Sequence, residues 1–98
     1  MKCYSVYDAS AEYFIPPFFA RTDNEAKRMF IGSLGQSFQF RHDFNLFRVA
    51  SFDQETGVFN AEAAPVIVIS GASIPADQGP NEFPVVSAEI PEEFNQPV

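Results

Sequence analysis

The stretch NLFRVASFDQETG, residues 45–57, decides the fold, because it predicts a strand that runs directly into a hairpin turn. Side-chain alternation divides residues 45–52 into two faces, both largely apolar. One face would carry Leu46, Arg48, Ala50 and Phe52, and the other Phe47, Val49 and Ser51. Apolar residues on both sides indicate a strand near the centre of a small sheet.

The residues that follow predict a hairpin partner for this strand. Within FDQETG (52–57), Asp53 can accept backbone hydrogen bonds, and Gly57 can adopt the positive φ that closes a short turn. A return strand is expected over residues 58–70. PVIVIS (65–70) is its strongest part, and NAEAAP (60–65) is where it would bulge or break.

Residues before the central strand predict two further strands. KCYSVY (2–7) alternates so that Tyr4 and Val6 share one face. PFFAR (17–21) favours a short extended segment. Residues 8–17 are expected to form a loop, because Pro16 and Pro17 cannot donate to a central ladder.

TDNEAKRMFIGSLG (22–35) predicts the single helix of the domain. Thr22 is a good N-cap and Glu25 follows three residues later, which is the capping-box pattern. The apolar stripe would consist of Ala26, Met29, Phe30 and Leu34. Gly35 is a plausible end of the helix.

Length and composition predict one α+β domain followed by a tail. Ninety-eight residues suffice for a single domain. We expect it over residues 1–70, as a small, mainly antiparallel sheet in the order β-β-α-β-β with the helix on one face. Residues 71–98 contain five prolines and five acids without a Lys or Arg, which predicts an extended acidic tail.

Charge is distributed unevenly along the chain. The net charge is −7, yet residues 1–48 hold all six Lys and Arg against five acids, a balance of +1. Residues 49–98 hold eight acids and no base, a balance of −8. Bulk charge therefore argues against non-specific phosphate binding, and only a local basic face in the first half remains open.

Residues for catalysis or metal binding are scarce. Cys3 and His42 are the single cysteine and histidine, so a zinc site of the usual kind and an intrachain disulfide lack ligands or partners. No glycine-rich phosphate loop or serine nucleophile motif occurs. We therefore expect no enzyme activity, no cofactor and no metal. The longest apolar run, PVIVI (65–69), is far too short to span a bilayer, so no membrane association is expected.

The segment QSFQFRHD (36–43), expected to be a loop, supplies the best candidate site. Single-stranded nucleic acid is held by aromatic faces beside cationic groups. The candidate nucleic-acid-binding residues are Lys27, Arg28, Phe38, Phe40, Arg41, His42 and Arg48. Most of the twelve phenylalanines must fill the core, and Phe44, Phe47 and Phe52 are the ones expected there.

Several motifs in a fixed order resemble a known phage family. Tyr7-Asp8 ends an opening strand, and a PPF segment (16–18) leads to the helix start TDNEA (22–26). LFRV (46–49) then runs into FDQETG (52–57). Over roughly residues 2–70, this order resembles the small non-structural protein of gokushovirus-type microviruses, which are bacteriophages with single-stranded DNA genomes.

The resemblance implies a non-structural protein that binds single-stranded DNA in the host cytoplasm and takes part in control of viral DNA replication or packaging. An alternative is a protein-interaction module that engages a phage replication, capsid or host protein through its aromatic surface and acidic tail. A Phe-rich sheet face left bare by the helix further predicts a homo-oligomer, most simply a dimer.

Overall fold

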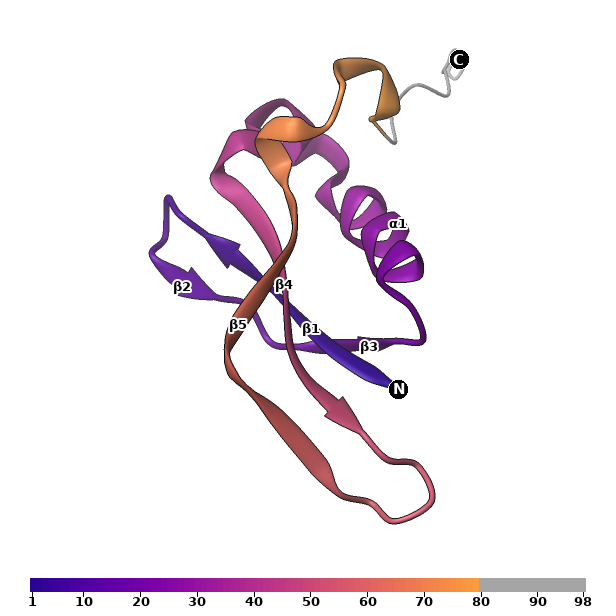
Figure 1. The fold of residues 1–98 in the computed structure, drawn as a ribbon. Helices are drawn as coiled ribbons and strands as arrows, with labels where there is room; N and C mark the ends of the chain where they lie inside the picture. The colour runs from indigo at the N-terminus through magenta and orange to yellow at the C-terminus, as the bar shows by residue number, and fades with distance from the viewer. Residues whose placement is uncertain (80–98) are drawn as a thin grey trace, which may run out of the picture.

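The computed structural model describes residues 1–79, so most of the predicted acidic tail, residues 80–98, lies outside the described residues. Five strands and one α-helix make up the body (Figure 1). The elements are β1 (Lys2–Asp8), β2 (Tyr13–Phe14), β3 (Phe18–Ala20), α1 (Asp23–Leu34), β4 (Phe44–Phe52) and β5 (Phe59–Ser70). Short 3-10 helices follow α1 and β5: η1 (Gly35–Asp43), η2 (Gly71–Ser73) and η3 (Ala76–Gln78).

The sheet is antiparallel throughout and confirms the predicted α+β class. Its strand order is β2-β1-β4-β5, and β3 pairs with the same edge of β1 as β2 does. Pro16 and Pro17 lie between β2 and β3, where they interrupt pairing along that edge. Residues 8–17 are therefore not all loop, because Tyr13 and Phe14 pair with the end of β1.

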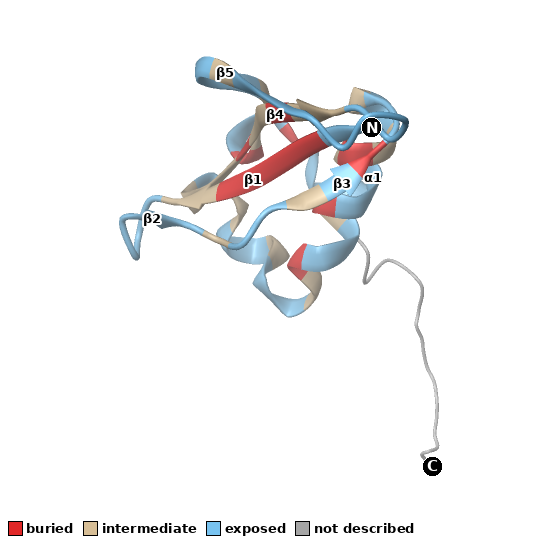
Figure 2. Cartoon of the chain, turned by 90° about the horizontal axis from the view of Figure 1, so that it is seen from below, coloured by how far each residue is buried: buried red, intermediate tan, exposed pale blue. Residues whose placement is uncertain are grey.

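α1 lies against one face of the sheet and forms the core with it. Tyr4 and Val6 of β1 and Leu46 of β4 are buried against the helix, which contributes Ala26, Phe30 and Leu34. Figure 2 shows β1 as the most buried strand and β5 as largely exposed. The alternation predicted for β1 is confirmed, since Tyr4 and Val6 share the helix-covered face.

The start of α1 follows the predicted cap with one difference. Thr22 Oγ1 accepts a hydrogen bond from the Glu25 backbone N–H at 3.1 Å. Glu25 Oε1 accepts from the backbone N–H of Arg21, one residue before the cap, at 2.7 Å. Met29, predicted to belong to the buried stripe, is exposed at the side of the helix.

A β-bulge in β4 corrects the predicted division of its faces. Tyr4 pairs with Arg48, whereas the preceding Cys3 pairs with Ala50, so Val49 is an extra residue in β4. Beyond the bulge the side chains change sides. Leu46 and Arg48 face α1, whereas Ala50 and Phe52 lie on the opposite face with Phe47.

Two further predictions differ from the structure. The expected loop at residues 36–43 is the 3-10 segment η1, in which Phe40 interrupts the helical dihedral angles. Ile74, four residues past the domain end predicted at residue 70, is 3% exposed and belongs to the core. The Ser70 side chain caps η2 by accepting from the Ala72 N–H, which turns the chain back over the body.

Candidate nucleic-acid interface

η1 holds Phe38 and Arg41 against the body of the protein. The Arg41 guanidinium lies 4.6 Å from the centroid of the Phe38 ring. Its Nε donates to the Ile74 carbonyl at 2.8 Å and its Nη1 to the Phe38 carbonyl at 3.2 Å. Phe38 itself packs against the core. These contacts show that Arg41 and Phe38 stabilise the packing of η1 and the chain around Ile74.

Arg48 occupies an ion-pair network under the helix. Its Nη1 lies 3.3 Å from Asp23 Oδ2, and its Nε lies 3.0 Å from Glu62 Oε2. The Tyr4 hydroxyl donates to Asp23 Oδ1 at 2.6 Å. Hydrogen bonding to Glu62 raises the pKa of Arg48, and the hydrogen bond from Tyr4 lowers the pKa of Asp23. Two carboxylates thus already neutralise Arg48.

Two of the seven predicted residues, Arg48 and Arg41, lie at opposite ends of α1. Arg48 is bound to Asp23, the first residue of α1. Arg41 belongs to η1, which begins directly after the last residue of α1. A helix of 12 residues separates these ends by about 18 Å. Lys27 and Arg28 lie on the helix between them, and Phe40 and His42 are exposed on η1.

The helix-free face of the sheet gathers aromatic side chains instead. Phe47 is the register partner of Ser5, and Phe19 that of Cys3. These two β1 residues point away from α1, because they alternate with residues of the core. We call this surface the aromatic face, and its members are Tyr7, Phe14, Phe19, Phe47, Phe52 and Phe59.

The aromatic face consists of two ring clusters. In the first, Phe14 lies 4.9 Å from Tyr7 and 5.5 Å from Phe47, centroid to centroid. In the second, Phe52 lies 4.8 Å from Phe59, and Phe19 lies 6.1 Å from each of them. Their β1 neighbours, residues 7 and 3, are four residues apart, which separates the clusters by about 13 Å.

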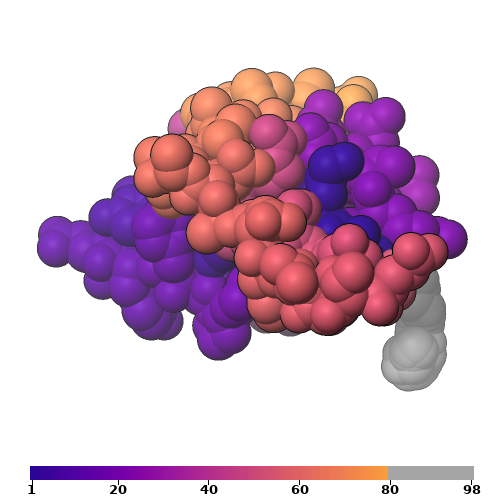
Figure 3. Space-filling model, turned by 60° about the horizontal axis from the view of Figure 1, so that its bottom comes forward, coloured from indigo at the N-terminus to yellow at the C-terminus, as the bar shows by residue number. Residues whose placement is uncertain are grey.

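Positive groups lie beside the second cluster. The Met1 amine donates to the Phe52 carbonyl at 3.2 Å. Arg21 directly follows β3, which contains Phe19, whereas Lys2 shares the helix-covered face with Tyr4. The Arg21 side chain is 80% exposed despite an ion pair to Glu25 at 3.7 Å. Figure 3 shows the indigo N-terminal residues next to the pink β4–β5 hairpin. Cations and exposed rings therefore meet at this end of the sheet.

The sequence contained a partial signal for this surface. Phe-rich strands predicted an apolar face opposite the helix, and the structure places that face as expected. Four of the seven residues assigned to the site came from the 36–43 segment, because side chains in a presumed loop were expected to be free. The other three were Lys27, Arg28 and Arg48. Phe47 and Phe52, assigned to the core, instead lie half-buried on the aromatic face.

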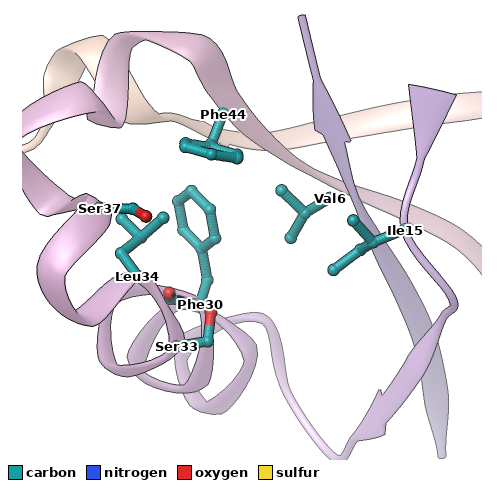
Figure 4. A pocket seen from close by; sticks show the side chains of 7 residues that line it. All are labelled: Val6, Ile15, Phe30, Ser33, Leu34, Ser37 and Phe44. Atoms are coloured by element: carbon teal, nitrogen blue, oxygen red, sulfur yellow. Dashed lines mark hydrogen bonds between the residues drawn. The ribbon is translucent and has the colours of Figure 1, made fainter. Parts of the chain in front are cut away.

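A shallow apolar cavity opens on the other side of the sheet, between α1 and β1. It measures about 240 Å³, and Figure 4 shows Val6 and Ile15 facing Phe30, Leu34 and Phe44 across it. Ser33 and Ser37 supply its polar atoms. No side chain lining it titrates near neutral pH, so the cavity offers no acid or base for catalysis.

Residues 1–79 contain no group of three or more potential metal-binding side chains. Within the same described part, no helix has the length and apolar character required to cross a membrane.

Comparison with known proteins identifies a family but no individual relative. A family model described as Phage ORF5 protein matches residues 1–74. This range contains every strand of the sheet, α1 and the core residue Ile74. Neither a curated protein nor a solved structure matches the chain significantly.

Proposed function

The chain belongs to the Phage ORF5 protein family, and from this premise we propose that it is a bacteriophage non-structural protein that binds single-stranded DNA on its aromatic face. The gokushovirus-like motifs support a role in the control of viral DNA replication or packaging, carried out in the host cytoplasm.

The observation that carries the proposal is the row of accessible rings on the helix-free face. Phe59 is 56% exposed and Phe14 and Phe19 are each 42% exposed, although rings of this size are normally buried. Bases stack on such rings whatever their sequence, and stacking contributes about 1–3 kcal/mol per base. A spacing of about 13 Å between the clusters suits an extended strand that places a base on each of them.

Electrostatics favour phosphate contacts at one end of the aromatic face. The Met1 amine and Arg21 can approach phosphates next to the cluster of Phe19, Phe52 and Phe59. The described residues hold six Lys and Arg against nine Asp and Glu, a net charge of −3, so this local group must supply the phosphate contacts. We expect modest affinity with few phosphate contacts and a shallow salt dependence.

A matched pair of phenylalanines tests which surface binds DNA. Phe59 on the aromatic face and Phe40 on η1 are 56% and 57% exposed, so Phe59→Leu and Phe40→Leu remove equally accessible rings. Loss of one stacked base predicts that Phe59→Leu weakens binding of oligothymidine by roughly 5- to 150-fold, with Phe40→Leu close to the wild type. Fluorescence anisotropy with a labelled oligonucleotide measures both.

A loss of affinity in Phe40→Leu alone would instead assign the site to the 36–43 segment. Thermal unfolding of both variants provides the control, because a ring that serves only the fold would change the melting temperature rather than the affinity at low temperature.

The second candidate function is a protein-interaction module. The observation that favours it is the acidic balance of the described residues, together with the neutralisation of Arg48 by Asp23 and Glu62. Retention on single-stranded DNA at about 50 mM and about 200 mM salt separates the two functions. No retention at either concentration favours the protein-interaction module.

A further inference from the structure

β5 forms an unusually long free edge of the sheet described by residues 1–79. It has 12 residues and lies at one end of the strand order. The opposite edge consists of β2 and β3, which have two and three residues and are separated by Pro16 and Pro17. Edge strands present unpaired backbone N–H and C=O groups that can pair with another chain, and short strands and prolines suppress this.

The second half of β5, residues 66–70, lacks the charged side chains and prolines that usually protect such an edge. The whole strand contains no Lys or Arg, and its single acid, Glu62, is bound to Arg48. Pro65 lies in the irregular part of β5 that spans the register shift opposite Val49. Beyond it, Val66 and Ile67 are 37% and 55% exposed. The apolar second half of β5 is therefore an accessible edge for pairing.

Charge indicates which occupant suits this edge. Residues 63–76 form an uncharged run in a chain whose net charge is −7. Two copies of an acidic protein repel each other over most surfaces, and this repulsion is least where both present an uncharged segment. In a two-fold symmetric contact the same segment of each copy meets its counterpart.

We propose that two copies of this chain pair through antiparallel β5 strands, which joins their sheets into one. Each copy satisfies the outward backbone groups of the other, and the uncharged segments 63–70 lie at the two-fold axis. The pairing goes beyond the proposed function, because it would also join the two aromatic faces into a longer surface. The chain's own residues 80–98 fit the edge less well, since they contain four prolines without an N–H and four acids.

The oligomeric state of the full chain tests the pairing. Sedimentation equilibrium at high micromolar concentration is expected to give a dimer. In the dimer, Ala64→Lys or Ile67→Lys would place one ammonium group from each copy near the two-fold axis. Because these two groups repel each other, each variant should weaken dimerisation at least tenfold. Ser10→Lys, on the turn between β1 and β2, adds the same charge at the far edge and should leave the dimer intact.

Disulfide crosslinking supplies a second readout that needs no disruption of the edge. In a Cys3→Ser background, Ile67→Cys, near the centre of the segment 63–70, should form a covalent dimer on mild oxidation, and Ser10→Cys should not. A wild-type monomer, or a dimer that both β5 lysine variants retain, overturns the proposal. Dimerisation that occurs only after deletion of residues 80–98 also overturns it, because that segment would then cover the edge.

Failure of the pairing can be distinguished from failure of the proposed function. A monomer that binds oligothymidine overturns the β5 pairing and leaves the DNA-binding proposal intact. A dimer that does not bind oligothymidine overturns the DNA-binding proposal and leaves the β5 pairing intact.

Discussion

At the scale of single residues, Arg48 shows how a cation that looks available in the sequence is used inside the fold. Its guanidinium bonds to Asp23 and Glu62, and Asp23 also accepts from the buried Tyr4 hydroxyl. These four side chains tie α1, β1, β4 and β5 together beneath the helix start. Their polar atoms stabilise the helix-covered face, so they are not free for phosphate.

The Tyr4–Asp23 hydrogen bond predicts a pH dependence of stability. Tyr4 lowers the pKa of Asp23, so the carboxylate stabilises the fold above its ordinary pKa of 3.8, and this contribution is lost as the pH falls through the lower value in the folded protein. Tyr4→Phe should therefore cost free energy of unfolding at about pH 6, and the cost should shrink toward about pH 2.

Urea denaturation of wild type and Tyr4→Phe across this pH range measures the effect. Glu25 and Asp53, whose pKa values are also lowered by backbone hydrogen bonds, keep their own pH dependence in the variant and provide an internal control. A Tyr4→Phe cost that does not vary with pH would show that the hydroxyl acts through packing alone.

At the scale of elements, the contact of η2 with η1 determines where the domain ends. Gly71 lies against the backbone carbonyl groups of Arg41 and Phe44, where a Cβ would overlap both oxygens. This close approach lets Ile74 reach the core and places its carbonyl next to the Arg41 guanidinium. The segment after β5 is therefore part of the packed body.

Two glycine substitutions test this element contact. Gly71→Ala should lower the free energy of unfolding by about 1–3 kcal/mol or more, because the backbone must move to admit the methyl group. Gly32→Ala is the matched control: it lies in α1 with no atom within 4 Å of a new Cβ, and it should raise stability by about 0.5–1 kcal/mol. Thermal or urea unfolding measures both, and equal stabilities would contradict the packed position of η2.

At the scale of the whole molecule, charge is divided between the described body and the acidic end of the chain. Residues 80–98 carry four acids and no base, so their removal changes the net charge from −7 to −3. Deletion after residue 79 retains Ile74 in the core, whereas a cut at the predicted boundary of residue 70 would remove it.

Removal of residues 80–98 should strengthen binding of single-stranded DNA. With less repulsion of phosphate, we expect a roughly three- to tenfold gain in affinity at about 50 mM salt and a smaller gain at about 200 mM. Replacing Glu82, Glu89, Glu92 and Glu93 by Gln at full length is the control, and it should reproduce the gain. Unchanged or weaker binding in both variants would exclude repulsion of the DNA by these acids.

Much of the fold was predictable because its signals are local. Thr22 and Glu25 cap α1 through neighbouring backbone groups, Asp53 and Gly57 form the β4–β5 turn, and the alternation of β1 sets its two faces. Each of these depends on dihedral angles and hydrogen bonds within a few residues. The sequence alone therefore determined the α+β class, the helix start and the hairpin.

Only the tertiary structure decided which side chains are available for binding. The bulge at Val49 moves Phe52 to the aromatic face, and long-range contacts occupy Arg41 and Arg48. Ile74 joins the core through a glycine that lies against backbone from another element. Whether a side chain is exposed depends on the strand register and on contacts with residues far away in the sequence. The spacing of residues along a single strand does not specify either of these.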